Sequence, residues 1–333
     1  MQQPIVSVVV VVHDRADMVD ALFRTLEEQS EPRFEVVVLL NDATRAMNEV
    51  VAAHAGGPLR LRTIECSAED NASTARNRGT EHAAGEILYF VDDDTELHPE
   101  SIAELVRITE ERPDVDIFGG PNLTPPDDPV FAHITGAILA SPMGTGPARS
   151  RYARVAARAA RERHLILCNL AVRRRVFDSG ISFPVLFGGE ENRLMGHATA
   201  TGFELWYAPE LWVYHRRRRN LSGYVEQMVR YGRGRALAMW WAPRTMHVAY
   251  LVPVGFLGYL AALPLLSVVT PLAGLPLAAY AGLVSIASVD VVVRERRPLW
   301  LPVVPGLFLV THLAYAWGLS STLVRLRLGG SGA

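Results

Sequence analysis

Residues 86–94 read EILYFVDDD, an apolar run that passes directly into three carboxylates. A run of this length without polar alternation is typical of a strand that is covered on both faces, as in a parallel sheet. Ligands of such sheets bind at the carboxyl ends of the strands. Asp92, Asp93 and Asp94 repel one another unless a positive group lies among them. The stretch therefore predicts a central strand of an α/β domain, with a ligand site at its end.

The sequence on either side repeats a pattern of strand followed by helix. Strands are predicted at 6–12, 34–40 and 59–65, and helices at 18–28, 44–55, 71–84 and 99–110. Strands that alternate with helices form a mostly parallel sheet with helices on both faces. The apolar run at 5–12 lacks a basic flank and is too short for a signal peptide, so it is expected to be a strand.

Two further strands are also expected to end in polar side chains. His13, Asp14 and Arg15 follow the strand at 6–12, and Asn41 and Asp42 follow the strand at 34–40. Because the carboxyl ends of parallel strands meet at one edge of the sheet, these side chains are expected near the three aspartates.

The composition excludes several classes of protein. Of the 333 residues, 49% are hydrophobic and 20% are charged, which is too apolar for a disordered chain. The only two cysteines, Cys66 and Cys168, exclude a disulfide scaffold and a four-cysteine zinc site, and Cys168 is expected in the core. Residues 1–146 carry 26 acids and 10 arginines (net −16), whereas residues 147–333 carry 9 acids and 23 arginines (net +14). The asymmetry predicts different partners for the two halves.

Two long uncharged runs predict membrane segments. Residues 245–289 contain no Asp, Glu, Lys or Arg over 45 positions, enough for two spans near 247–269 and 273–293. The alternative, a pair of buried core helices, is disfavoured because soluble domains rarely need so long an uncharged run. The run at 298–324 has 27 residues and could be a third span.

Arginines flank these runs and predict their orientation. By the positive-inside rule, the clusters at 216–219 and 294–297 are expected in the cytoplasm. The N-terminal 240 residues are then expected there too. If the third run spans the membrane, Arg325 and Arg327 lie outside, against the rule, so a re-entrant or interfacial segment remains an alternative. The arginine clusters, including 173–175, favour anionic lipid head groups or a lipid-linked pyrophosphate rather than nucleic acid as a partner.

The three aspartates predict a cation site. Carboxylates without neighbouring His or Cys ligands suit Mg²⁺ or Mn²⁺ held together with substrate phosphates. The alternative is a solvated turn with a helix-capping aspartate. Arg76, in ARNRG at 75–79, precedes the acidic strand and could neutralise a diphosphate, although alone it would pass as a surface arginine.

Taken in order, the motifs resemble a family 2 glycosyltransferase with the GT-A nucleotide-sugar fold. They are VSVVVVVHDR at 6–15, the strand end at 41–42, ARNRG at 75–79, FVDDD at 90–94, CNLAVRR at 168–174, FGGEEN at 187–192, GFELWYAPE at 202–210, WVYH at 212–215 and QMVRYGRGRA at 227–236. HLAYAWG at 312–318 is similar to a phrase of the membrane-anchored polysaccharide branch. The resemblance implies a Rossmann-like GT-A domain over 1–240, followed by a membrane region over 245–328 with two to three transmembrane or interfacial helices.

The resemblance also implies roles for single residues. The nucleotide-sugar site would comprise His13, Asp14, Arg15, Asn41, Asp42, Arg76, Asp92 and Asp93. Asp92 and Asp94 would form the Asp-x-Asp pair that holds Mg²⁺ or Mn²⁺, with Asp94 the direct ligand and His215 approaching the metal or the phosphates. Glu191 would be the catalytic base and Glu190 would orient it or bind the acceptor.

This sequence departs from the family pattern at three places. Asn41 stands where an Asp is usual, and Glu191 replaces the usual catalytic Asp, which changes its reach. The processive Gln-x-x-Arg-Trp motif, expected to bind the acceptor, appears as Gln227, Arg230 and Tyr231 without its Trp. The missing Trp weakens the case for processive synthesis.

The sequence therefore predicts a membrane-anchored, metal-dependent, inverting hexosyltransferase on the cytoplasmic side. A nucleotide-sugar donor, expected to be UDP-linked, would supply a lipid-linked or growing glycan acceptor in cell-envelope or exopolysaccharide synthesis. Two alternatives are a polyprenyl-phosphate glycosyl synthase and a non-catalytic nucleotide-sugar-binding membrane protein.

Overall fold

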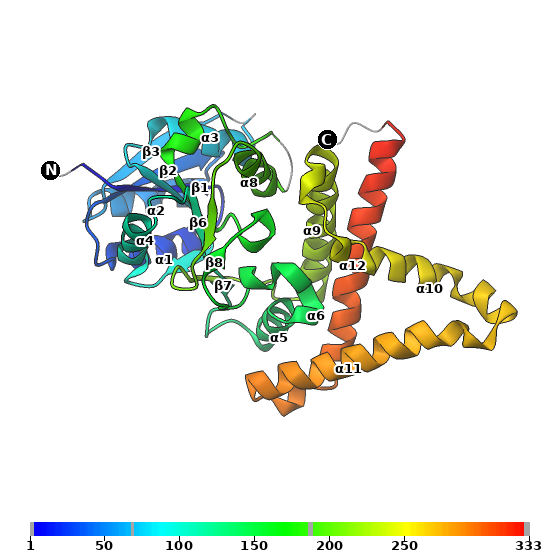
Figure 1. Ribbon diagram of the computed structural model, residues 1–333. Coiled ribbons are helices and arrows are strands. Elements are labelled where there is room, and N and C mark those ends of the chain that lie inside the picture. The colour runs from blue at the N-terminus through cyan, green and yellow to red at the C-terminus, as the bar shows by residue number, and fades with distance from the viewer. Residues whose placement is uncertain (1–2, 68–69, 186–188, 330–333) are drawn as a thin grey trace. The chain divides into compact units, whose positions relative to one another are not determined.

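The computed structural model describes residues 3–67, 70–185 and 189–329 (Figure 1). The chain divides into two compact units. The first comprises residues 1–125, 150–186 and 190–216, and the second residues 126–149, 187–189 and 217–333. Each unit is described by itself.

The first unit is built on an eight-stranded sheet in the order β3–β2–β1–β4–β9–β6–β10–β8. Its strands are β1 (Val6–Val12), β2 (Phe34–Asn41), β3 (Leu61–Cys66), β4 (Ile87–Asp92), β6 (Ile117–Gly119), β8 (Arg158–Ala159), β9 (Asn169–Arg173) and β10 (Leu205–Tyr207). β1 pairs in parallel with both β2 and β4, as the strand–helix alternation predicts. The strand order reverses about β1, which makes its carboxyl end a topological switch point.

Helices cover both faces of this sheet. One face carries α1 (Ala16–Glu27), α2 (Arg45–Ala55) and α4 (Ser101–Glu111), and the other carries α3 (Ala72–His82), α7 (Arg174–Asp178) and α8 (Glu190–Ala200). Successive residues of β1 alternate between the two cores: Val8 and Val10 pack on the first face and Val9 on the second. This alternation explains why the strand is apolar at nearly every position.

The predicted elements of the first 111 residues are all present, with ends that differ by at most two residues. The α/β fold with a mostly parallel sheet is therefore confirmed. The sequence analysis did not anticipate that β9 lies antiparallel between β4 and β6. All five residues of β9 are buried, so their apolar pattern carries no information about strand direction.

A second, three-stranded sheet in the first unit has the order β5–β11–β7. Its strands are β5 (Thr95–Leu97), β7 (Asn122–Leu123) and β11 (Val213–His215). β11 runs antiparallel to β5, with His215 opposite Thr95. This pairing brings a residue from position 215 beside the aspartates at the end of β4.

The second unit is helical. Its helices are α5 (Val130–Leu139), α6 (Pro142–Thr145), α9 (Leu221–Trp241), α10 (Val252–Val269), α11 (Leu275–Glu295) and α12 (Val304–Arg327). Three segments are long and apolar enough to cross a membrane: Val248–Val269, Pro271–Glu295 and Val304–Arg327. They coincide with the three runs found in the sequence.

The third segment differs from the first in its surroundings. Within the described chain, 44% of its most apolar window is buried, against 0% for Val248–Val269. α12 packs closely along α9. A Cβ atom at Gly318 would lie 2.1 Å from the carbonyl oxygen of Val229, and one at Gly232 would lie 2.2 Å from that of Tyr315. Two glycines therefore permit this helix contact.

Helix α5 lies in a stretch whose composition predicts a long irregular segment. It is a ten-residue apolar helix whose Ile138 packs in one cluster with Val292 of α11 and Phe308 of α12. The partners that stabilise α5 are more than 150 positions away, so the local sequence does not reveal them.

Candidate active site

The site lies where β1 and β4 end, at the switch point of the sheet. β1 leads into His13, Asp14 and Arg15, and β4 leads into the three aspartates. Arg15 forms ion pairs with both Asp93 and Asp94, and its Nε also lies 3.1 Å from Asp93 Oδ2. Burial, reinforced by the neighbouring carboxylates and opposed by Arg15, raises the pKa of Asp93 to about 7.

His215 completes this group from the second sheet. Its Nε2 lies 3.0 Å from Asp94 Oδ1 and 3.8 Å from Asp92 Oδ2. Burial disfavours the charge on both His215 and Asp94, but the attraction between opposite charges is stronger. The carboxylates raise the pKa of His215 to about 9. His215 and Arg15 hold the pKa of Asp94 well below its usual range. The geometry places His215 beside Asp92 and Asp94, and its approach to a metal or to the phosphates stays a prediction.

The side chains of Asp92, Asp94 and His215 fit a divalent cation. His215 Nδ1 is buried and has no hydrogen bond within the described residues, whereas Asp94 Oδ1 is buried against His215 Nε2. Unpaired buried donors and acceptors are costly, so a cation bound to them would remove that cost. A set of two carboxylates and one imidazole fits Mg²⁺ or Mn²⁺, and more closely Mn²⁺, which accepts nitrogen ligands.

A thiol also lies at this group, which the sequence analysis assigned to the core. Cys168 is 1% exposed, and its Sγ lies within 4.8 Å of ligand atoms of Asp92 and His215. Asn122 Nδ2 donates a hydrogen bond to this Sγ at 3.3 Å. No spacing in the sequence links position 168 to positions 92 and 215, so only the fold reveals the contact.

Arg76 joins the aspartates to α8. Its Nη2 lies 3.4 Å from Asp92 Oδ1 and its Nη1 lies 3.3 Å from Glu190 Oε1. Burial, and then the charge of Glu191, raise the pKa of Glu190. α3 carries Arg76 close to the sheet because Gly79 faces β1, where a Cβ would lie 2.7 Å from Val9 Cγ1.

Glu191 is held by two polar side chains. Its Oε1 accepts a hydrogen bond from Asn192 Nδ2 at 2.8 Å and lies 3.7 Å from Arg151 Nη1. Arg151 also donates to Asn192 Oδ1 at 2.7 Å. The sequence analysis missed Arg151, which lies in an arginine-rich stretch with no distinctive pattern. In the FGGEEN motif, Phe187 and Gly188 lie outside the described residues.

Several of the residues predicted to contact the nucleoside, at the ends of β1 and β2, are exposed. His13 is exposed, and its Nδ1 is 2.7 Å from the carbonyl oxygen of Asn41. Asp14 and Asp42 are exposed, and Asp42 adopts a left-handed conformation with φ of 51° as the chain leaves β2. The structure thus brings together His13 and Asn41.

The predicted acceptor residues lie on α9, in the second unit. Gln227 is buried at 6% exposure, whereas Arg230 is exposed and Tyr231 is partly exposed. Because the two units are described separately, the assignment of these three residues to an acceptor stays a prediction.

Three features together define the GT-A fold of nucleotide-sugar enzymes. They are a sheet with a switch point, an Asp-x-Asp motif at a strand end, and a histidine that a second small sheet places beside it. The chain belongs to glycosyl transferase family 2, whose family model matches residues 7–180. The expected family and fold are therefore confirmed.

Solved structures agree with this fold. The chain is 19% identical to the mannosyltransferase PcManGT from Pyrobaculum calidifontis, solved with GDP-Man and Mn²⁺, with a TM-score of 0.64 over 97% of this chain and 88% of that one. It is 16% identical to residues 1–349 of S. aureus TarS in complex with UDP-GlcNAc, with a TM-score of 0.51 over 97% and 92%.

Curated relatives are distant. Glycosyltransferase AglE of Haloferax volcanii is 24% identical over 263 residues, covering 76% of this chain and 82% of its own length. The amylovoran biosynthesis glycosyltransferase AmsB of Erwinia amylovora is 26% identical over 106 residues, 31% of this chain and 35% of its own. An uncharacterized glycosyltransferase of Haemophilus influenzae matches over 44% of its length. The match thus spans less than half of the latter two relatives.

Proposed function

We propose that this chain is a metal-dependent, inverting glycosyltransferase that moves a sugar from a nucleotide-sugar donor to a lipid-linked or growing glycan acceptor. The observation that carries the proposal is the convergence of Asp92, Asp94 and His215 at the switch point, together with the buried His215 Nδ1, which has no hydrogen bond within the described residues. Arg76, which bridges Asp92 to Glu190, supports the same conclusion.

The leaving diphosphate is the group that needs stabilisation. Asp94 and His215 would hold Mg²⁺ or Mn²⁺, with Asp92 beside them, and the ion when bound would offset the charge that develops on the diphosphate. Arg76 would contribute a second positive charge to the same group. His13, Asp14, Arg15, Asn41, Asp42 and Asp93 would surround the nucleoside.

The acceptor hydroxyl needs a base. We assign this role to Glu191, which would take the proton while Glu190 orients it, so that attack opposite the leaving group inverts the anomeric centre. Glu190 is the second candidate, because its raised pKa suits a proton acceptor and Arg76 ties it to Asp92. The pH dependence of kcat/KM in Glu190→Gln and Glu191→Gln would separate the two: the base is the residue whose loss removes the acidic limb of the profile.

The membrane role is proposed from the second unit. Three helices long enough to span a bilayer support an anchor over 245–328 that follows a catalytic domain over 1–240 on the cytoplasmic side. Gln227, Arg230 and Tyr231 on α9 would bind the acceptor. Relatives named for amylovoran and teichuronic acid biosynthesis support a role in cell-envelope or exopolysaccharide synthesis.

The experiment uses the full chain purified in detergent with Mn²⁺. A panel of labelled UDP- and GDP-sugars is offered, and transfer or hydrolysis is measured for wild type, Asp94→Asn and a control, Asp178→Asn, which removes an exposed carboxylate at the end of α7. Wild type and control are expected to turn over one donor, and Asp94→Asn to lose at least about 100-fold in kcat.

Two outcomes support the alternatives. A wild type that binds a sugar nucleotide but never turns it over contradicts the enzyme proposal and identifies a binding protein. A product that partitions into organic solvent and is released by mild acid identifies a polyprenyl-phosphate glycosyl synthase.

A further inference from the structure

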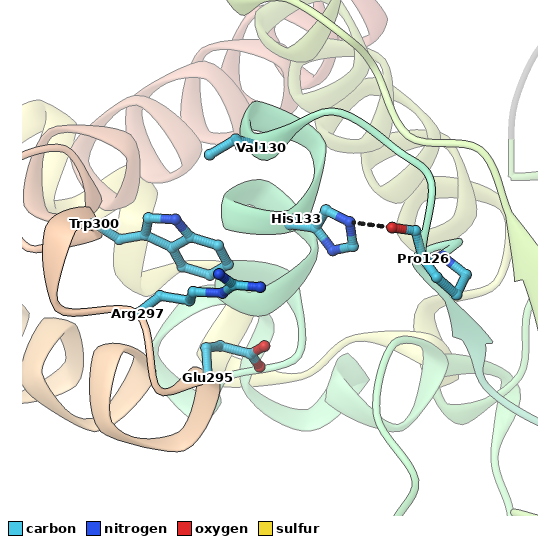
Figure 2. A pocket seen from close by; sticks show the side chains of 6 residues that line it. All are labelled: Pro126, Val130, His133, Glu295, Arg297 and Trp300. Carbon is cyan, nitrogen blue, oxygen red and sulfur yellow. Dashed lines mark hydrogen bonds between the residues drawn. The ribbon is translucent and has the colours of Figure 1, made fainter.

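A cavity of about 410 Å³ lies within the second unit and is lined by none of the residues of the candidate active site (Figure 2). It is lined by Pro126, Val130, His133, Glu295, Arg297 and Trp300. The first three belong to the start of α5 and the residues before it, and the last three to the end of α11 and the turn that follows it. Pockets of several hundred Å³ commonly bind small ligands or head groups.

The walls of this cavity are fixed by a buried core. Ile134 and Ile138 on α5 pack in one cluster with Val292 of α11 and Phe308 of α12, and Trp300 packs against the same cluster. His133 Nε2 lies 3.3 Å from the carbonyl oxygen of Pro126, which ties the start of α5 to the preceding segment. The lining side chains thus project from elements that the core holds in place.

The position of the cavity along the chain indicates where it lies in a membrane. It is formed where the candidate span Pro271–Glu295 ends, a few residues before the candidate span Val304–Arg327 begins. Tryptophan and arginine are enriched at this level, where the hydrocarbon meets the head groups. The inference therefore rests on the membrane anchor of the proposed function.

Both signs of charge face the cavity. In Figure 2 the guanidinium of Arg297 and the carboxylate of Glu295 point toward His133 on α5. Both residues are exposed, and no ion pair is recorded for either within the described residues. α5 begins after Pro129, without a side-chain cap, and its N-terminus adds partial positive charge to the wall that Val130 and His133 form.

Exposed apolar side chains, here called the rim, include Val130 of the lining and three residues next to or near Trp300 in the sequence. Leu299 is 89% exposed and Val130 is 63% exposed, and Leu301 and Val303 are each nearly half exposed. A soluble phosphate would leave this surface in water, whereas a lipid would cover it with acyl chains. The rim therefore favours a lipid over a soluble ligand.

We propose that this cavity binds the head group of a zwitterionic phospholipid of the phosphatidylethanolamine type. Arg297 and the start of α5 contact its phosphate, and Glu295 contacts its ammonium. An anionic lipid such as phosphatidylglycerol offers the same phosphate but no ammonium, so it fits less well because it would leave Glu295 without a partner. Trp300 packs beside the glycerol region at the interface.

The test measures lipid retention by native mass spectrometry on the full chain in detergent, after competition between phosphatidylethanolamine and phosphatidylglycerol. Wild type is expected to retain phosphatidylethanolamine in preference, by roughly fivefold. Arg297→Gln is expected to lose retention of both lipids by roughly fivefold, whereas Glu295→Gln is expected to keep phosphatidylglycerol and lose the preference. Arg325→Gln, which removes an exposed arginine that does not line the cavity, is the control and should match wild type.

Three results would overturn the proposal. One is equal retention of the two lipids by wild type, and another is an unchanged preference in Glu295→Gln. The third is binding of soluble phosphorylethanolamine as tight as that of the lipid, which would identify a head-group site without a lipid requirement. Because none of these measurements uses sugar transfer, a chain that retains the lipid but transfers no sugar contradicts the proposed enzyme alone.

Discussion

Strand β1 and helix α10 are both apolar runs without charge, yet their surroundings are opposite. Six of the seven residues of β1 are buried, whereas the most apolar window of Val248–Val269 is 0% buried within the described chain. Composition does not separate them, but length does: seven residues suit one buried strand, and 22 suit a bilayer span. An apolar run thus indicates removal from water, and its length indicates whether protein or lipid removes it.

The largest test of this comparison places a charge on each kind of exposed surface. Ala262, near the middle of α10, and Ala53, on α2, are both exposed helical alanines. Ala262→Arg is expected to disfavour membrane insertion of its segment by about 3 kcal/mol, because the charge meets hydrocarbon. Ala53→Arg meets water and is expected to have no effect.

The measurement is the fraction of chain that remains in the membrane after alkaline carbonate extraction. Equal fractions for Ala262→Arg and Ala53→Arg would show that the exposed face of α10 lies in water or against protein. The membrane reading of the second unit would then be wrong.

A second test compares two valines. Val8 of β1 is 0% exposed and Val268 of α10 is 84% exposed. Val8→Ala is expected to lower the free energy of unfolding by about 2 kcal/mol, since it leaves a cavity between sheet and helices. Val268→Ala should change it by less than about 0.5 kcal/mol in detergent. Urea unfolding of the full chain, followed by tryptophan fluorescence, measures both, and a large effect at Val268 would place that side chain against protein.

The helix pair α9–α12 sharpens the comparison within the second unit. Gly318 has the carbonyl oxygen of Val229 where a Cβ would lie, whereas Gly258 on α10 has nothing within 4 Å. Gly318→Ala is expected to lower the thermal midpoint in detergent, with a cost of about 1–3 kcal/mol from overpacking. Gly258→Ala is expected to leave the midpoint unchanged or raise it slightly. An unchanged midpoint for Gly318→Ala would show that the two helices are not tightly packed.

How far the sequence predicts the molecule follows from the range of its interactions. The strands and helices of the first 111 residues, and Asp92 to Asp94 at the end of β4, follow from local patterning. The resemblance to a family adds His215, which the β11–β5 pairing then places 3.0 Å from Asp94.

Other features depend on contacts between distant residues with no distinctive local pattern. Arg151 reaches Glu191, and Cys168 reaches Asp92 and His215, only because the fold brings them together. The antiparallel direction of β9 and the packing of α5 on α11 are of the same kind. Such contacts depend on packing between distant residues, which the local pattern of polar and apolar residues does not reveal.

The thiol of Cys168, beside the end of the buried strand β4, leads to a prediction about which metal ions bind there. A sulfur ligand favours thiophilic cations over hard ones. Cys168→Ser is therefore expected to weaken Cd²⁺ binding by roughly tenfold and to leave Mn²⁺ binding nearly unchanged. Competition of each ion against a fluorescent chelator measures both affinities. Cys66→Ser, at the end of β3, is the control, and equal losses for the two ions would show that Sγ is not a ligand.

The smallest expected effect concerns His54, which ties α2 to α1 in the first unit. Its Nδ1 lies 2.7 Å from Glu27 Oε1 and its Nε2 2.9 Å from Asp20 Oδ1. Burial opposes the charge, but the two carboxylates outweigh it and raise the pKa of His54 above 6.5. A raised folded-state pKa gives stability that is fully present below pH 6.5 and is lost as the pH rises through the folded value.

His54→Gln should therefore cost the most at acidic pH, by about 1 kcal/mol or less, and its difference from wild type should shrink as the solution becomes alkaline. Urea unfolding across the neutral range measures this difference, with His197→Gln on the exposed side of α8 as the control. A difference that grows with pH would show that His54 is held in its neutral form. A neutral ring has a single N–H and donates to only one of the two carboxylates. The other carboxylate would then face the lone pair of the second ring nitrogen, and only one of the two contacts would stabilise α1 against α2.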